Sequence, residues 1–344
     1  MLAISAVLML LAGVAGCTAE KKEEPASEEG KLNVVTTLFP YYDFVRQTAG
    51  DHVELSMVVP AGMDSHSFEP TPADMLTIQN ADLLICNGGQ MEHWLTEVLE
   101  AIDTSNMKVI TMMDYVETFE EESVEGMEEG AEHHHSEDEH KGHTDREYAN
   151  REYADHDYVD HDGHEMEIEY DEHIWTSPVN AMKIVTVISE TLQEMDPSNK
   201  DAYVQNEKAY LEQLSQIDTD LKEIASQEKR NMIVVGDKFP FRYLAEEYRL
   251  DYRAAFSGCS TDTEPSAKTI AYLIDKVRQD KIPVVYYLEL SSHRVSEIIG
   301  EETGAEPLLL HSCHNVTRKE FDGGITYVDL MRQNVINLRK GLDE

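Results

Sequence analysis

The chain has 344 residues and is strongly acidic: 68 Asp and Glu stand against 28 Lys and Arg, a formal net charge of −40 at pH 7. Such a charge excludes nucleic acid as the expected partner. Hydrophobic residues make up 41% of the chain, and its length is sufficient for two modest domains. No interior stretch is apolar over a length that would span a membrane.

The N-terminal segment is expected to export and anchor the protein. Residues 1–16 form an apolar run typical of a signal peptide, and the segment ending in Gly16-Cys17 resembles the bacterial lipobox. Cys17 is therefore expected to be lipidated, and residues 17–30 to be a polar tether. This predicts an extracytoplasmic protein, lipid-anchored to the cell membrane. A plain signal peptide with a chance cysteine is the alternative.

Residues 31–197 are predicted to form an N-terminal α/β lobe. Apolar strands are expected at 32–37, 53–59, 82–87 and 108–112, and helices at 41–49, 71–80, 92–101 and 178–195. Apolar strands that alternate with helices indicate a parallel sheet with helical crossovers.

An insert at residues 119–170 interrupts this lobe and consists mainly of acidic residues and histidines. Imidazole is a common ligand of Zn²⁺, and an acidic field concentrates cations around it. The insert is predicted to be a disordered loop that collects metal, although a merely solvated acidic insert has the same composition. It contains eight of the 15 histidines of the chain: His133, His134, His135, His140, His143, His156, His161 and His164.

Residues 198–228 are predicted to form one long linking helix, followed by a second α/β lobe at 229–344. Strands are expected there at 232–235, 251–256, 283–289 and 307–311, and helices at 238–248, 265–279, 291–303 and 328–341. The predicted fold class is α/β, with two similar lobes of parallel sheets flanked by helices and joined by one long rigid helix.

Possible metal ligands lie in loops at the expected strand ends of both lobes, where open α/β sheets bind ligands. Each has a structural alternative: a single loop histidine is often a surface residue, and a carboxylate at a strand end can cap the next helix. The candidates are His66, His173, Asp237, Glu289, His311, Cys313 and His314.

Three segments resemble motifs of one known family. They are Gly62-Met-Asp-Ser-His-Ser-Phe-Glu-Pro-Thr-Pro-Ala-Asp, Asn87-Gly-Gly-Gln-Met-Glu-His-Trp-Leu and Asp171-Glu-His-Ile-Trp-Thr-Ser-Pro. The first and third resemble the two ligand motifs of the zinc/manganese solute-binding lipoproteins of ABC importers (cluster A-I), and the second resembles that family's Asn-Gly…Glu-x-Trp-Leu stretch. A histidine-rich insert before the third motif is typical of the zinc-type members. The resemblance covers nearly all of residues 31–344 and implies one metal ion held in the cleft between the lobes.

The resemblance implies His66 and His173 as ligands from the first lobe. The family usually places His or Glu after the first strand of the second lobe, where this chain offers Asp237, and Asp after the last strand, where His311 aligns best. His311 is thus preferred to its competitor His314, and Glu289 is a reserve ligand. The resemblance also implies a disulfide between Cys259 and Cys313, with Cys313 as a thiolate ligand the alternative.

We therefore expect a monomeric zinc-binding component of an ABC metal importer, which captures Zn²⁺ and delivers it to a membrane permease. It is not expected to be an enzyme, because the sequence shows neither a His-Glu-x-x-His motif nor a Ser/His/Asp arrangement, which argues against a zinc hydrolase. A manganese-binding importer component, with Mn²⁺ as cargo, and a surface zinc sponge or adhesin are the other readings. Zinc is preferred to manganese because imidazole outnumbers carboxylate among the candidate ligands.

Overall fold

The computed structural model describes residues 30–127, 169–227, 229–260 and 264–343. The predicted signal peptide, Cys17 and the eight histidines of the insert lie outside these ranges. The chain divides into two compact units, Met1–Lys31 and Leu32–Glu344, and everything below concerns the second. Among its described helices, none combines the length and the apolar character that crossing a membrane requires.

The first lobe contains a four-stranded parallel sheet with the strand order β2-β1-β3-β4. Its strands are β1 (Leu32–Thr36), β2 (Val53–Met57), β3 (Leu83–Cys86) and β4 (Lys108–Thr111). Its helices are α1 (Phe39–Ala49), α2 (Pro72–Gln79), α3 (His93–Ala101) and α4 (Pro178–Met195). β3 is buried along its whole length, as its continuous apolar sequence predicts.

The second lobe repeats this order with the strands β6-β5-β7-β8, again all parallel. They are β5 (Met232–Phe239), β6 (Asp251–Ser257), β7 (Val284–Tyr287) and β8 (Glu306–Leu309). The helices are α6 (Arg242–Tyr248), α7 (Ala267–Asp280), α8 (Arg294–Thr303), α9 (Arg318–Asp322) and α10 (Tyr327–Leu342). The prediction of two parallel-sheet lobes is confirmed.

The largest difference from the predicted boundaries of this lobe lies at the end of β5. We expected a helix to begin at Lys238, but β5 continues through Phe239 and α6 begins at Arg242. β5 pairs with β6 on both sides of a register shift between Val235 and Lys238. This irregularity extends β5 to the edge of the site, and Pro240 follows it, which cannot donate a further strand hydrogen bond.

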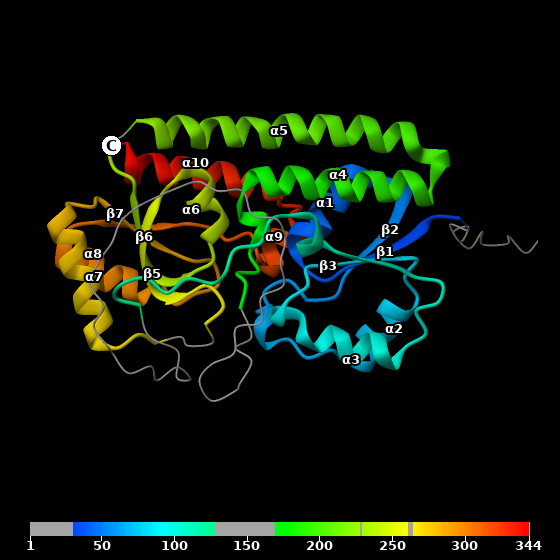
Figure 1. Ribbon diagram of the computed structural model, residues 1–344, viewed down its shortest axis with the longest axis horizontal. Coiled ribbons are helices and arrows are strands. Elements are labelled where there is room, and N and C mark those ends of the chain that lie inside the picture. The colour runs from blue at the N-terminus through cyan, green and yellow to red at the C-terminus, as the bar shows by residue number, and fades with distance from the viewer. Residues whose placement is uncertain (1–29, 128–168, 228, 261–263, 344) are drawn as a thin grey trace, which may run out of the picture. The chain divides into compact units, whose positions relative to one another are not determined.

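The helix α5 (Lys200–Ser226) joins the two lobes. Its 27 residues correspond to about 40 Å of α-helix. It packs against α1 and α4 of the first lobe and α10 of the second, and Figure 1 shows it running alongside α4 and α10. The buried positions lie at helical spacing along one face: Tyr203, Tyr210, Leu214, Ile217, Asp218, Leu221 and Ile224. One continuous helix thus contributes to the cores of both lobes.

A buried carboxylate ties these helices together. Asp43 on α1 is fully buried. It accepts hydrogen bonds from the Tyr210 hydroxyl on α5 (3.1 Å), from the backbone N–H of Tyr327 on α10 (2.7 Å) and from the guanidinium of Arg46 (2.6 Å). Arg46 also donates to the Ile325 carbonyl of the second lobe (2.5 Å). Because a buried charge is costly without partners, this network favours one arrangement of the lobes.

Candidate metal centre

Three histidines from three separate loops meet between the lobes. His66 lies in a short 3-10 helix, Ser65–Ser67, beyond β2, and its backbone N–H donates to the Asp64 carboxylate (3.0 Å). His173 directly precedes another 3-10 helix, Ile174–Thr176, which leads into α4. His314 lies in the loop between β8 and α9. Each side chain is therefore placed by a local turn at the end of a regular element.

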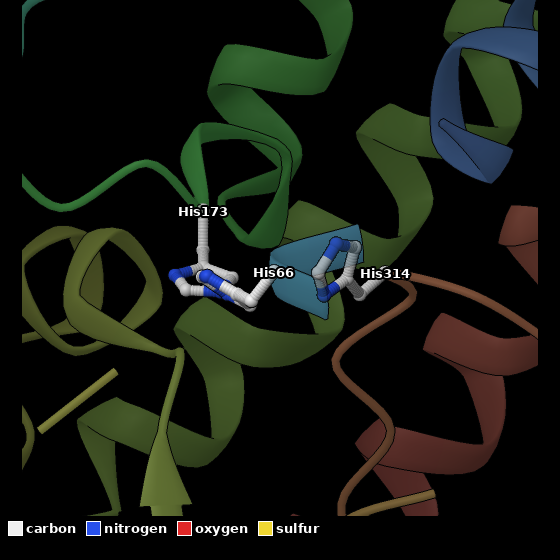
Figure 2. A group of neighbouring side chains, drawn as sticks. All are labelled: His66, His173 and His314. Atoms are coloured by element: carbon white, nitrogen blue, oxygen red, sulfur yellow. The ribbon is translucent and has the colours of Figure 1, made fainter. Parts of the chain in front are cut away.

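The three side chains form a compact group with imidazole nitrogens at its centre. One ring nitrogen from each of His66, His173 and His314 lies within 4.8 Å of the other two. The ring centroids are 5.6–5.9 Å apart, and Figure 2 shows the three rings gathered from different parts of the chain. A tetrahedral Zn²⁺ with bonds of about 2.0–2.1 Å needs nitrogens about 3.4 Å apart. A small inward movement of the rings would meet that requirement.

Asp171 orients His173. The Nδ1–H of the buried His173 ring donates to Oδ1 of Asp171 (3.2 Å), which also accepts the His173 backbone N–H (2.8 Å). Nδ1 is thereby occupied, and Nε2 keeps its lone pair for a metal, the arrangement common around zinc-bound histidines. Burial lowers the pKa of His173, but the Asp171 charge and hydrogen bond raise it above its ordinary value overall.

The other two imidazoles are held in the neutral form. Burial and the neighbouring His173 lower the pKa of His66 to about 4. Burial, His173 and His66 lower the pKa of His314 well below its ordinary value, and the charge of Lys238 acts in the same direction on both rings. Only a neutral imidazole donates a lone pair to a metal, so these two rings need not lose a proton first.

The loop that carries His314 is fastened to the first lobe. The amide of Asn315 donates to the carbonyls of Pro60 (2.8 Å) and Met63 (2.7 Å), which precede His66. The indole N–H of Trp175 donates to the Ser312 carbonyl (2.9 Å). These bonds connect all three histidine-bearing segments and so preorganise the group.

His311, preferred to His314 from the sequence, lies outside the group. Its backbone N–H donates to the side-chain oxygen of Asn334 on α10 (2.7 Å), and its carbonyl accepts a hydrogen bond from the Asn334 side-chain amide (2.7 Å). Its Nδ1 accepts the Cys313 N–H (2.9 Å). Its buried Nε2 has no partner among the described residues. Cys313 has a left-handed backbone (φ 60°), and beyond it His314 is the side chain that joins His66 and His173.

Asp237 and Glu289 line a cleft beside the histidines but are not members of the group. Asp237 accepts the backbone N–H of Lys238 through Oδ1 (2.9 Å). Glu289 accepts the Ser312 N–H (2.8 Å) and the Ser312 hydroxyl, and one of its oxygens lies 3.5 Å from His311 Nδ1. The described geometry therefore assigns Glu289 a bracing contact with the His314 loop.

The predicted disulfide is wrong for the described structure, in which Cys86, Cys259 and Cys313 are free thiols. Cys259 lies near Glu121, to which its N–H donates (2.8 Å), and near Asp171. Cys313 is fully buried, and burial and the charges of Glu289 and Asp43 raise the pKa of its thiol. Different charged groups act on the two thiols, and burial raises the pKa of both.

A comparison with known families agrees with this geometry. The family described as "ZnuA: Zinc-uptake complex component A periplasmic" matches residues 34–341, nearly the whole of the described unit. The chain belongs to this family.

Characterised relatives span the same region. The chain is 31% identical over 330 residues to the "High-affinity zinc uptake system protein ZnuA" of Bacillus subtilis, covering 96% of the chain and 93% of that protein. It is 30% identical over 316 residues to the "Zinc-binding lipoprotein AdcA" of Streptococcus pneumoniae. It spans only 57% of that relative's length.

Solved structures give the same fold. The Zn(II)-bound ZnuA-like domain of Streptococcus pneumoniae AdcA superimposes with a TM-score of 0.69 at 28% identity, covering 92% of this chain and 100% of that domain. The metal-dependent lipoprotein YcdH from Bacillus subtilis superimposes with the same TM-score and identity, covering 91% of this chain.

Two residues near the histidine group, Asp171 and Lys238, were given no role in the sequence analysis. Asp171 stands two residues before His173, a spacing at which a carboxylate can turn back to the imidazole, and this signal was available. Lys238 near His66 and His314 was not foreseen, because it depends on the extension of β5.

Proposed function

We propose that this chain is the extracytoplasmic zinc-binding component of an ABC importer. It captures Zn²⁺ in the cleft between its lobes and delivers the ion to a membrane permease. We assign His66, His173 and His314 as the ligands, with His314 in place of the His311 expected from the sequence. Their three converging ring nitrogens, within 4.8 Å of one another, are the observation that carries this proposal.

The donor set favours zinc over manganese. Three neutral imidazoles are the ligand set of many zinc sites, whereas Mn²⁺ prefers carboxylate and carbonyl oxygens. The nearby carboxylates of Asp237 and Glu289 hold hydrogen bonds to the backbone N–H groups of Lys238 and Ser312. Two relatives named for zinc binding or zinc uptake support the same choice.

A direct test is zinc titration against a chelator of known affinity. The wild type should bind one tight equivalent, and His66→Ala or His173→Ala should weaken that equivalent at least a thousandfold by removing one of three ligands. His93→Ala is the matched control, since this histidine is exposed on α3 and lies outside the group. Unchanged tight binding in His66→Ala would contradict the proposed site.

The histidine-rich insert and the lipid anchor remain parts of the proposal. We propose that the insert delivers metal to the cleft and that Cys17 carries the anchor; the name of the lipoprotein relative supports the latter. Deleting residues 128–168 should remove weak extra zinc equivalents and keep the tight one. Loss of the tight equivalent in the folded deletion variant would move the primary site to the insert.

A further inference from the structure

The backbone of Asp171, the residue that orients His173, is held by residues from both lobes. Asp171 is 2% exposed. Its N–H donates to the carbonyl of Phe119 (2.9 Å), which lies in the first-lobe segment after β4. Its carbonyl accepts a hydrogen bond from the hydroxyl of Tyr243 on α6 of the second lobe (2.6 Å). The support of His173, a first-lobe histidine, thus includes a side chain of the second lobe.

The hydroxyl of Tyr243 bonds to two first-lobe residues at once. It donates to the Asp171 carbonyl and accepts the backbone N–H of Phe119 (3.3 Å). The Tyr243 side chain is buried, and its ring packs against that of Phe119, with the two centroids 5.3 Å apart. A phenol has one proton to donate, and here that proton goes to Asp171. Tyr243 therefore sets where the Asp171 backbone lies relative to the second lobe.

The second lobe also comes into close contact with the Asp171–His173 pair through Gly258. This glycine follows β6, and a Cβ at its position would lie 3.0 Å from Oδ2 of Asp171 and 3.4 Å from Nδ1 of His173. A glycine permits such a close approach of the backbone because it has no side chain. The carboxylate and the ring that it orients therefore lie directly against the second lobe.

We propose that Tyr243 is a positioning residue for zinc, whose hydroxyl holds Asp171 where its carboxylate orients the His173 imidazole. This inference rests on the proposed zinc site and adds to it a residue that acts through Asp171. The hydrogen bond on one ring nitrogen of a metal-binding histidine sets the direction of the other nitrogen, so a displaced carboxylate misdirects Nε2. Without the hydroxyl, the buried carbonyl of Asp171 loses its donor, and one of the two hydrogen bonds that fix its backbone is gone.

The test is zinc competition with a chelator in Tyr243→Phe, which removes the hydroxyl and keeps the ring beside Phe119. Zinc affinity should fall about tenfold, the lower end of the range for lost outer partners of metal-bound histidines. Tyr252→Phe is the matched control, because this buried tyrosine also donates to the first-lobe segment, at Glu122 (3.0 Å) and not at Asp171. The control should change zinc affinity by less than about twofold.

A double-mutant cycle separates positioning from a general effect on the fold. Asp171→Ala removes the carboxylate, so Tyr243→Phe in that background should change zinc affinity by less than about twofold. Spectra of the zinc-loaded protein labelled with ¹⁵N-histidine give a second readout. The Nδ1–H of His173 should be protected from exchange with water in the wild type and in Tyr252→Phe, and should exchange faster in Tyr243→Phe.

Three results would overturn the proposal. Tyr243→Phe could bind zinc as tightly as the wild type. It could lose the same factor with and without the Asp171 carboxylate, which would make its role structural. It could leave the exchange of the His173 Nδ1–H unchanged. All three results presuppose tight zinc binding by the wild type and its loss in His173→Ala, so they are distinct from failure of the zinc site itself.

Discussion

The contact between Asp171 and His173 gives a sharp prediction for Asp171→Asn. The carboxylate accepts two hydrogen bonds from His173, one from the ring (3.2 Å) and one from the backbone (2.8 Å). Asparagine keeps an acceptor oxygen but loses the negative charge that makes the imidazole more basic. Loss of such a partner typically costs 10–100-fold in metal affinity. We expect zinc binding at pH 7.5 to weaken by this factor, or about 1.4–2.7 kcal/mol.

The same substitution should change the pH dependence. The pKa of His66 is lowered to about 4 and that of His314 well below 6.5, so between pH 7.5 and 5.5 neither ring takes a proton that zinc must displace. His173, whose pKa is raised, does take one. Wild-type affinity should therefore fall about tenfold per pH unit below the pKa of His173. Three ordinary imidazoles would give a fall of up to about a thousandfold per unit.

In Asp171→Asn no carboxylate counteracts the lowering of the His173 pKa by burial, so that pKa falls. Protons then compete with zinc for His173 only at lower pH. The difference in zinc affinity between wild type and variant should shrink from pH 7.5 to pH 5.5. Chelator competition at each pH measures it, with Asp201→Asn, at an exposed position on α5, as the control. Equal affinities at pH 7.5, or a constant ratio across the range, would refute this account of Asp171.

Three further predictions follow from the described contacts. His314→Ala should weaken zinc binding at least a thousandfold and His311→Ala less than tenfold in the same competition assay, and the reverse order would restore the assignment made from the sequence. Zinc should change the tryptophan fluorescence, because the Trp175 ring lies 5.4 Å from that of His314; Trp175→Phe should abolish the change and Trp94→Phe should keep it. Asp43→Ala should lower the free energy of unfolding by about 3–5 kcal/mol in denaturant titrations, because it leaves buried donors without their acceptor; a loss below 1 kcal/mol would show that the lobes do not depend on this network.

The alternation of strands and helices could be predicted from the sequence because it depends on local patterns. Buried parallel strands appear as continuous apolar runs, and α4 occupies the predicted 178–195 because Pro178 at its start and Asp196-Pro197 after its end mark both boundaries. His66 and His173 could be singled out as well, because each lies within a segment whose neighbouring residues also match the family motif.

The second-lobe side of the site could not be predicted in this way. Whether His311 or His314 faces the other histidines depends on the left-handed turn at Cys313 and on the clamp from Asn334, which is 20 residues or more away in the chain. The position of Lys238 depends on the register shift of β5 against β6. Local patterns contain no information about such distant contacts.

The sequence by itself thus determined the two α/β lobes and the linking helix, and it singled out His66 and His173, since these follow from periodicity and from short contiguous motifs. Only the tertiary structure decided which second-lobe histidine completes the group, that Cys259 and Cys313 are free thiols, and that a cavity with Lys238 in its wall adjoins the three histidines. The reason is physical: these properties depend on how separate loops pack against one another, and that packing is set by buried hydrogen bonds between residues distant in the chain.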